Sequence, residues 1–462
     1  MSENDLYENY SNIAHVDLYY FNLRRIKKMK IKMKDIVVIG FALFAMFFGA
    51  GNLVFPPYLG VLDGTKWFIG FIAFLFADGG LALLGVVAMT RTGGDLDALY
   101  SRAGKKIGLV IGTASILCIG PFLAIPRTAA VTFEVGINPV FGDSFSPVVF
   151  SIIFFAITLF LTIKPSKVVD IVGQFLTPAL LVCLAVLIVK GIISPLGTPL
   201  ERTLVDNVVV KGIYDGYQTM DAMASCIFAG IVISSVKAKG YTDQGSLVKA
   251  TVYAGIVAVA GLAFVYGGLS YLGATVSPMF DDTVGKSALI ISITESILGG
   301  PGKVILAIIV ALACLTTSIG LTSACGNYFR DITGGKLKYE RTVIVVCIFS
   351  AIVSNLGLDK IISMAVPILL TVYPAVVTYI ILGLFSDKIS NNNIFKFAIW
   401  VSVILGLLSA LPAVPGLADN AAIQAMGAKL NALPGGEFGF FWIIPVAVAG
   451  LVGKFLPSKV KA

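Results

Sequence analysis

The sequence contains little charge and few of the residues that enzymes use for catalysis. Of its 462 residues, 13% are Asp, Glu, Lys or Arg, whereas a soluble domain carries about 25%. It has one histidine, His15, and six cysteines without a Cys-x-x-Cys pair, so it indicates neither a zinc site nor a disulfide framework. Walker A, His-Glu-x-x-His and Gly-x-Ser-x-Gly motifs are also missing. We therefore expect neither an enzyme, nor a cofactor, nor ATP-driven transport by this chain alone.

Long apolar segments dominate the sequence, which is 57% hydrophobic. A helix that crosses a bilayer needs about 20 mostly apolar residues. The segments predict an all-α integral membrane protein with twelve transmembrane helices. The expected ranges are 35–58, 67–90, 107–132, 147–163, 168–190, 213–236, 247–273, 303–325, 342–356, 361–385, 394–412 and 438–456.

The distribution of Lys and Arg predicts the orientation in the lipid bilayer. Most of the 34 such residues fall in connections on the side of the N-terminal tail, which the positive-inside rule assigns to the cytoplasm. We expect residues 1–33 to be a disordered cytoplasmic tail and residues 34–462 to form one transmembrane domain with both termini in the cytoplasm. The net charge of +8 then reflects this asymmetry and indicates no nucleic-acid partner.

The first span has an interruption near its middle. Gly49, Gly51 and Asn52 follow an apolar run, and the segment closes on Pro56 and Pro57. Glycine releases backbone from helical geometry at little steric cost, and a bilayer tolerates unwound backbone only where protein buries it or a wet cavity meets it. The pattern indicates a broken helix whose free amides and carbonyls face something polar. A helix that packs closely through its glycines is the alternative.

The sixth span has a similar interruption within residues 213–225. Two interrupted spans at corresponding positions of two halves are typical of transporters built from inverted repeats, with the substrate site between them. We therefore expect a 5+5 inverted repeat with broken helices 1 and 6. The first repeat would cover about 35–190, the second about 213–385, and two accessory helices would lie at about 394–456.

Four charged residues lie within predicted spans, where charge is costly and commonly functional. Arg127 would pair with Asp215 or Asp221 as a gate near the outer mouth, or these residues form a static ion pair. Asp221 follows the second interruption and is the better candidate for a protonatable residue. Asp78 lies beside Gly79, which favours a role in helix packing.

Adjacent hydroxyls in the eighth span form another candidate site. Thr316, Thr317 and Ser318 could bind a hard cation such as sodium, which prefers oxygen ligands. The alternative is that these hydroxyls bond back to carbonyls one turn earlier in their own helix.

Three motifs together carry a resemblance to a known family. They read Phe-Phe-Gly-Ala-Gly-Asn-Leu-Val-Phe-Pro-Pro at 47–57, Gly-Pro-Phe-Leu-Ala-Ile-Pro-Arg-Thr-Ala at 120–129 and Tyr-Gln-Thr-Met-Asp at 217–221. Over about residues 34–458 the chain resembles the branched-chain amino acid:cation symporters, the BrnQ-type carriers of bacteria. That family is similar, more distantly, to the leucine-transporter fold of five plus five inverted spans.

The resemblance implies a secondary symporter of the bacterial inner membrane that imports leucine, isoleucine or valine with sodium by alternating access. The amides of Ala50 and Gly51 would hold the substrate carboxylate. One sodium ion would bind the carbonyls of Ala45 and Phe48 and the hydroxyls of the two adjacent threonines. The sodium ligands are thus Ala45, Phe48, Thr316 and Thr317.

A branched aliphatic side chain needs a dry pocket, for which Phe48, Ile125, Tyr217 and Phe228 are the candidate walls. The residues expected to bind substrate are Phe48, Gly49, Ala50, Gly51, Asn52, Ile125, Tyr217, Gln218 and Thr219. A carrier that couples to protons through Asp221 or Asp78 is the main alternative. A channel is disfavoured by the paired broken helices and by the lack of a charge ring or a repeated carbonyl filter.

Overall fold

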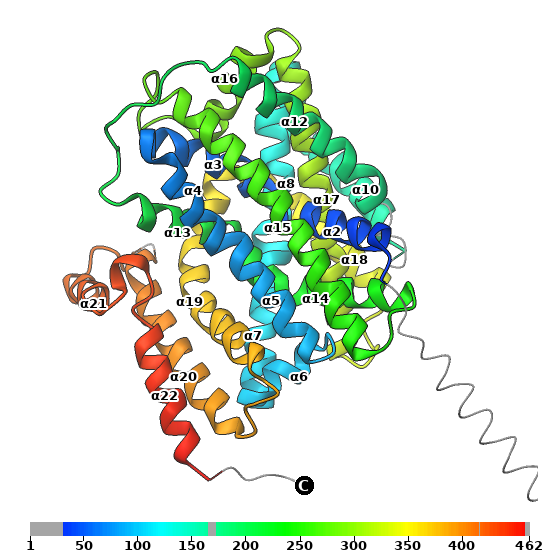
Figure 1. Cartoon of the computed structure of the whole chain (residues 1–462), viewed down its shortest axis with the longest axis vertical. Helices are drawn as coiled ribbons and strands as arrows, with labels where there is room; N and C mark the ends of the chain where they lie inside the picture. The colour runs from blue at the N-terminus through cyan, green and yellow to red at the C-terminus, as the bar shows by residue number, and fades with distance from the viewer. Residues whose placement is uncertain (1–30, 165–171, 415, 458–462) are drawn as a thin grey trace, which may run out of the picture.

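Helices form all the regular structure in residues 31–164, 172–414 and 416–457, the part of the chain that this computed structural model describes (Figure 1). The all-α prediction is therefore confirmed for these residues. The predicted tail, residues 1–33, lies outside them except for 31–33, and so does the start of the predicted span at 168–190.

Helices of the first half run as follows, with π-helical and 3-10 turns labelled η. They are α2 (Met33–Phe47), α3 (Ala50–Asp63), η1 (Gly64–Lys66), α4 (Trp67–Leu75), η2 (Phe76–Gly80), α5 (Leu81–Arg91), α6 (Leu96–Tyr100), η3 (Ser101–Ala103), α7 (Lys105–Leu117), η4 (Cys118–Phe122), α8 (Ala124–Val131), η5 (Thr132–Ile137), α9 (Asn138–Phe141), η6 (Gly142–Ser144), α10 (Pro147–Thr162), η8 (Val172–Leu176) and α12 (Thr177–Ile193).

The second half contains longer helices. They are α13 (Val208–Thr219), α14 (Asp221–Ala238), α15 (Gln244–Thr275), α16 (Lys286–Leu298), α17 (Gly302–Ile332), α18 (Tyr339–Val353), η9 (Ser354–Leu356), α19 (Leu358–Leu384), α20 (Asn392–Ala410), η10 (Leu411–Ala413), α21 (Ala421–Asn431), η11 (Gly436–Phe438) and α22 (Ile443–Phe455). Side chains define several starts: Asn207, Asp243 and Asn420 accept backbone N–H bonds at the first turns of α13, α15 and α21.

Nine stretches of the described residues are long and apolar enough to cross a bilayer. They are Ala50–Arg91, Lys105–Phe141, Gln174–Ile193, Asp221–Ala238, Gln244–Thr275, Gly302–Ile332, Tyr339–Leu356, Leu358–Leu384 and Asn392–Ala413. Two shorter apolar helices are Pro147–Thr162 and Ile443–Phe455. Each predicted span overlaps a helix, and the first two partly merge because α3, η1 and α4 follow one another without a gap. The total of twelve spans and the inverted relation of the halves stay predictions.

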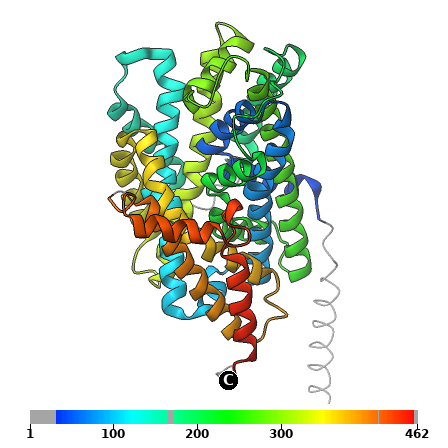
Figure 2. The ribbon, with the colours of Figure 1, turned by 90° about the vertical axis from the view of Figure 1, so that its left-hand side faces the viewer.

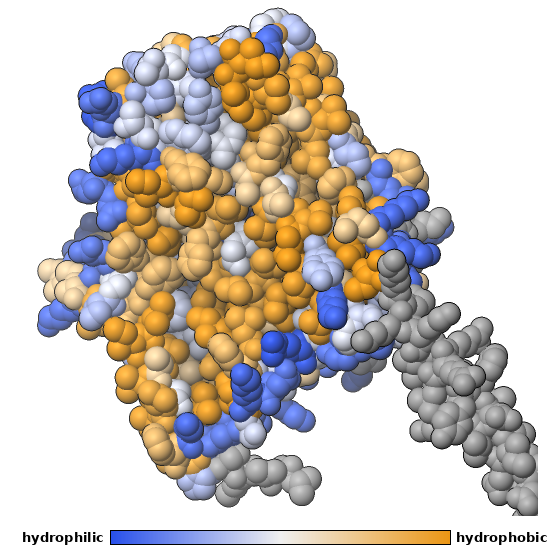
Figure 3. Space-filling view, in the orientation of Figure 1, coloured by the Kyte–Doolittle hydropathy of each residue, from blue (hydrophilic) through white to orange (hydrophobic). Residues whose placement is uncertain are grey.

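Large apolar side chains cover much of the outer surface. Phe160, Ile193 and Phe455 are among the most exposed, at 79%, 74% and 83%. Figure 3 shows apolar residues spread over most of one face, with polar residues concentrated toward its margins. An apolar surface this extensive is unfavourable in contact with water, whereas the hydrocarbon tails of a bilayer can solvate it.

Small residues let the central helices approach closely. α15 packs along both α2 and α3. A Cβ atom on Gly273 would overlap the carbonyl of Pro57, and one on Gly60 would overlap the carbonyl of Ser270. Close backbone contact of this kind is how membrane helices associate when lipid removes the hydrophobic driving force. The contact fixes α3, which carries the first interruption.

The last helices lie on one side of the molecule. α20 packs on α19, and α22 packs on α20. Figure 2, which faces that side, shows α20 to α22 in front of the other helices. They contribute no residue to the central cavity described below.

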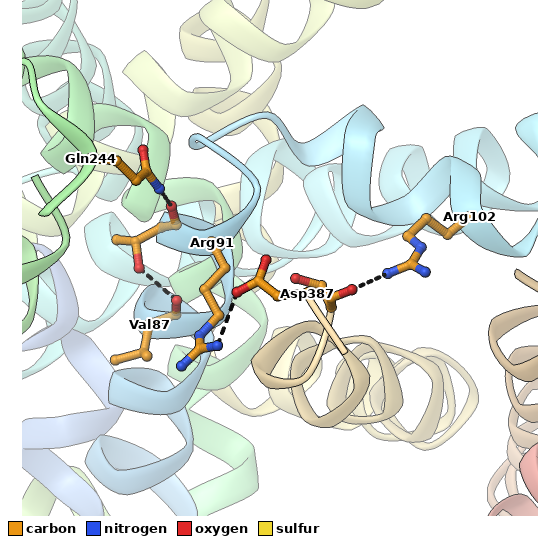
Figure 4. A network of polar contacts seen from close by, with 7 residues as sticks. Val87, Arg91, Arg102, Gln244 and Asp387 are labelled. Carbon is orange, nitrogen blue, oxygen red and sulfur yellow. Dashed lines mark hydrogen bonds and ion pairs between the residues drawn. The ribbon is translucent and has the colours of Figure 1, made fainter. Parts of the chain in front are cut away.

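A polar network joins three connections at one end of the helices (Figure 4). Arg91 forms an ion pair with Asp387, with 3.1 Å between Nη1 and Oδ2. Gln244 Nε2 donates to the carbonyl of Thr90 at 3.2 Å. Arg102 Nε donates to Asn392 Oδ1 at 2.9 Å. These contacts therefore connect the end of α5 with the start of α15 and with the α19–α20 connection, and connect η3 with the start of α20.

Candidate functional site

The first helix break lies between α2 and α3. Phe48 (ψ 87°) and Gly49 (φ −115°, ψ −158°) have left helical geometry. The Gly49 amide donates to Asn52 Oδ1 at 3.3 Å. The amides of Ala50 and Gly51, in the first turn of α3, have no intrahelical acceptor, and the helix dipole places partial positive charge there. This end of α3 can therefore bind an anionic group.

The second break lies at Met220, between α13 and α14. Met220 has φ 72°, and within the described part of the chain it is the only residue other than glycine with a positive φ. Its side chain is buried. A bulky side chain in the left-handed region is strained, and strain of this kind concentrates at functional sites.

Both breaks face one cavity of about 30 Å3. Its lining comprises Met46, Phe47, Gly49, Ala50, Gly51, Asn52, Ile119, Ala124, Arg127, Thr128, Thr219, Met220, Asp221, Ala224, Phe228, Thr317 and Leu321. A cavity of this size holds about two water molecules. A larger ligand would therefore need the lining to move apart.

Several of the expected substrate-binding residues lie behind this lining. Phe48 stacks on Phe44, with ring centroids 5.4 Å apart. Tyr217 packs against Tyr373 at 4.4 Å. Ile125 is fully buried without reaching the cavity.

Sequence reasoning missed other residues of the wall. Among the apolar ones, Met46, Phe47, Ile119 and Leu321 line the cavity, together with the expected Phe228. The choice between Phe47 and Phe48 depends on the helical phase at the break, which the sequence does not specify. The Phe-Phe pair was the available signal.

The expected sodium ligands of α2 and α17 come together. Thr316 Oγ1 donates to the Ala45 carbonyl at 2.9 Å, and Thr317 Oγ1 lies 3.2 Å from the same oxygen. Thr316 Oγ1 also lies 2.9 Å from the carbonyl of Ala313, one turn earlier in its own helix. The geometry thus contains both the interhelical group of oxygens and the local back-bond that the sequence left open.

A buried polar network lies beside the cavity and joins five helical segments, α3, η2, α13, α14 and α15. Asn52 Nδ2 lies 2.9 Å from Asp221 Oδ2, 3.4 Å from Asp78 Oδ2 and 2.5 Å from the Tyr266 hydroxyl. Thr219 Oγ1 donates to Asp78 Oδ1 at 2.8 Å. Asp78 is in the π-helical turn η2, whose altered phase turns its carboxyl toward these partners. The sequence favoured helix packing for Asp78, and the structure adds this hydrogen bonding.

The carboxyl groups of Asp78 and Asp221 both accept from the side-chain amide of Asn52. Both side chains are almost fully buried, Asp78 at 0% and Asp221 at 5% exposed. Two carboxyl groups that share one donor in a dry site cannot both be ionised. The pair therefore carries one shared proton and one negative charge.

The two gate pairings expected for Arg127 are not formed in this structure. Asp215 pairs instead with Lys211 on the same helix, 2.5 Å from Nζ to Oδ1. Arg127 Nη1 donates to the carbonyl of Gln218 at 3.0 Å, and no ion pair in the described residues joins it to Asp221. The contact to Gln218 still connects α8 with α13 just before the second break.

Comparison with known sequences identifies the family. The profile described as "Branched-chain amino acid transport protein" matches residues 32–460. The chain belongs to this family. The match includes both helix breaks and every residue that lines the cavity. Family membership makes the chain an integral membrane protein of a transport family, which is not a family of enzymes.

Individual family members are similar over almost their whole length. The branched-chain amino acid permease BraB of Bacillus subtilis is 38% identical over 446 residues, which cover 94% of this chain and 98% of BraB. The branched-chain amino acid permease BrnQ of Salmonella typhimurium is 34% identical over 424 residues, covering 91% of this chain and 94% of BrnQ.

Solved structures of other transporters share the fold. A Na+-coupled sialic acid symporter aligns with a TM-score of 0.62 at 14% identity, over 92% of this chain and 91% of its own. MHP1, a nucleobase-cation-symport-1 family transporter, aligns with a TM-score of 0.58 at 13% identity, over 91% and 93%. The chain therefore has a fold similar to that of transporters with the leucine-transporter fold, whereas the inverted relation of its halves stays a prediction.

Proposed function

We propose that this protein is a secondary symporter that imports leucine, isoleucine and valine across the bacterial inner membrane. The observation that carries the proposal is the cavity between two broken helices, in a chain whose relatives are called branched-chain amino acid permeases. Phe47, Phe228, Met46 and Leu321 give the cavity an aliphatic and aromatic wall. Such a wall suits branched side chains and discriminates weakly, by about 1–3 kcal/mol per methylene.

The substrate carboxylate binds at the start of α3 in this proposal. The amides of Ala50 and Gly51 would donate to it, and Gly49 and Asn52 keep this turn open toward the cavity. Thr219 adds a hydroxyl group to the lining. The other residues expected to bind substrate, Phe48, Ile125, Tyr217 and Gln218, would support the site from behind.

Sodium is the proposed coupling ion. Its ligands would be the carbonyls of Ala45 and Phe48 and the hydroxyls of Thr316 and Thr317; both hydroxyls lie within hydrogen-bonding distance of the Ala45 carbonyl. Neutral oxygens suffice for a monovalent ion in a dry site. Sodium would join α2 to α17 and so favour the arrangement of the break that receives substrate.

Proton coupling is the second candidate, and the shared proton of Asp78 and Asp221 favours it. The pair contacts both broken helices, through Asn52 of α3 and Thr219 of α13. A change in its protonation would therefore alter how the helix halves are held. Intramembrane carboxyl groups of this kind are typical proton carriers.

The overall mechanism in this proposal is alternating access by a 5+5 inverted repeat of twelve spans with both termini in the cytoplasm. Paired broken helices around one cavity are what this mechanism needs. Arg127, Asp215 and Asp221 would contribute to gating, with Arg127 bound to Gln218 and Asp215 to Lys211 in the closed arrangement.

Uptake of labelled leucine into proteoliposomes tests the function and the ion together. Sodium and proton gradients are imposed separately, with choline replacing sodium as the control. We expect accumulation driven by the sodium gradient at equal pH, and saturable counterflow of leucine. Uptake that responds only to a proton gradient would transfer the coupling to Asp78 and Asp221. Passive, unsaturable flux would contradict a carrier.

A further inference from the structure

Two opposite charges face the central cavity without being joined to each other. Arg127 is 4% exposed and Asp221 is 5% exposed, and both contribute to the lining. None of the ion pairs in the described residues connects them. Buried charges are costly unless each has a partner of opposite sign. A ligand that carries both signs would supply both partners.

The guanidinium of Arg127 lies on the anion-binding side of the cavity. Nη1 is held by the carbonyl of Gln218 at 3.0 Å. Nη2 lies against Gly51, so closely that a Cβ atom on that residue would overlap it. The guanidinium is therefore next to the free amides at the start of α3. A carboxylate bound there would receive charge-assisted hydrogen bonds from an arginine fork as well as backbone amides.

Asp221 supplies the opposite side. Its Oδ2 is positioned by the amide of Asn52 at 2.9 Å, and Asp78 lies behind it, outside the lining. Asp221 is thus the carboxyl group of the pair that faces the cavity. The Asn52 amide also contacts Asp78 Oδ2 and the Tyr266 hydroxyl. These contacts fix the amide that positions the Asp221 carboxyl group. This arrangement suits a cationic group such as an ammonium.

We infer that Arg127 and Asp221 recognise the two charges of an α-amino acid, Arg127 its carboxylate and Asp221 its ammonium, with Asp78 as a positioning residue behind Asp221. The inference rests on the proposed function and deepens it, because it makes the zwitterion, and not only the aliphatic side chain, the determinant of specificity. A fatty acid would leave Asp221 unpaired, and an alkylamine would leave Arg127 unpaired. Both should bind poorly.

Competition binding against labelled leucine in purified, lipid-reconstituted protein tests the assignment. The competitors are leucine, 4-methylpentanoate, which lacks the ammonium, and 3-methylbutylamine, which lacks the carboxylate. In Asp221→Asn we expect leucine to bind about 10- to 100-fold more weakly, the loss of one charge-assisted hydrogen bond, with no loss for 4-methylpentanoate. In Arg127→Gln, leucine should weaken similarly while 3-methylbutylamine does not.

Three further variants separate recognition from structure. Asp221→Glu keeps the charge and should restore most of the preference for leucine over 4-methylpentanoate. Asp78→Asn removes the site of the shared proton and should make leucine binding depend on pH differently from the wild type. Glu134→Gln removes a carboxylate that holds the Leu358 amide outside the lining, and should leave the ranking of the three ligands unchanged.

The zwitterion assignment and the proposed function would be contradicted by different results. If Asp221→Asn weakens all three ligands by the same factor, or leaves leucine unaffected, the zwitterion assignment is wrong although the protein transports leucine. If the wild type binds another α-amino acid but not leucine, only the proposed substrate is wrong, and the corresponding two analogues of that amino acid test the assignment. A wild type that binds no amino acid overturns both.

Discussion

No side chain fits at residue 51, because the guanidinium of Arg127 occupies the place where a Cβ atom on Gly51 would lie. The conflict is with the end of a flexible side chain and not with backbone. A methyl group at residue 51 would therefore displace Arg127 rather than unfold the protein. It would separate the guanidinium from the carbonyl of Gln218, which is its hydrogen-bond acceptor.

Gly51→Ala should accordingly reduce leucine transport strongly while leaving the amount of protein in the membrane unchanged, and Gly51→Leu should abolish transport. The measurement is initial uptake normalised to reconstituted protein. Gly300→Ala is the matched control, because a Cβ atom there meets nothing within 4 Å. Leucine binding of wild-type strength in Gly51→Leu would contradict the broken-helix site.

Thr316 and Thr317 are the proposed sodium ligands on α17. Changing both to alanine removes two oxygens near the Ala45 carbonyl and should raise the sodium concentration for half-maximal leucine binding more than tenfold, about 1.4 kcal/mol. Serine at either position keeps the hydroxyl and should have a much smaller effect. Thr322→Ala, on the same helix, is the control, because no partner for its buried hydroxyl is found among the described residues. An unchanged sodium dependence in the double variant would favour proton coupling.

Individual residues show where the sequence was informative. Glycines and prolines predicted the first break, and the Thr-Thr pair of α17 predicted the contact of that helix with α2, because both patterns are local in the sequence. The presence of Phe47 rather than Phe48 in the cavity wall was not predictable, since the two differ only in helical phase at the break. The hydrogen bonds of Asp78 were not predictable either, because a π-helical turn changes which way a side chain points, and no residue pattern marks that turn.

The connection between α19 and α20 is fixed mainly by one arginine (Figure 4). Arg102 donates to the carbonyls of Ser386 and Ile389 and to the side chain of Asn392. Its guanidinium carbon also lies 4.0 Å from the ring centre of Phe395. By contrast, the neighbouring Arg91 makes one ion pair, whose side chains are 39% and 63% exposed.

Arg102→Ala should therefore lower the melting temperature of the purified protein clearly, with a loss of about 2 kcal/mol or more from several charge-assisted bonds. Arg91→Ala is the matched variant and should cost no more than about 1 kcal/mol, as exposed ion pairs do. Arg102→Lys should resemble the alanine variant, because lysine cannot reproduce the planar fork. Equal melting temperatures for Arg102→Ala and Arg91→Ala would show that the network does not hold this connection.

For the molecule as a whole, the sequence predicted the fold class because apolar runs and breaks are strong signals in a membrane protein. α16 begins and ends within an expected connection, and the last helices lie beside the others as accessory elements. The relation between the two halves depends on long-range packing, which the sequence does not show directly. The orientation depends on the membrane, and the sequence indicates it only through the distribution of Lys and Arg.

Cysteine labelling tests that orientation. A cysteine in place of Asn420, before α21, should react with a membrane-impermeant maleimide in intact cells. A cysteine in place of Lys336 should react only after the membrane is permeabilised. Background should be low, since five of the six native cysteines are buried and Cys183 is half-buried. Labelling of the Lys336 variant in intact cells would reverse the predicted topology.

The π-helical turn η2 has a mechanical consequence. A π turn contains one residue more than an α turn, so restoring α geometry over Phe76–Gly80 would swivel α4 against α5 by about 100°. Asp78 lies inside that turn, and the swivel would carry its carboxyl away from Thr219 and Asn52. A one-residue slip would thus release Asp78 from both broken helices while α5 keeps its packing, and would leave the contact of Asn52 with Asp221 as the direct link between those helices.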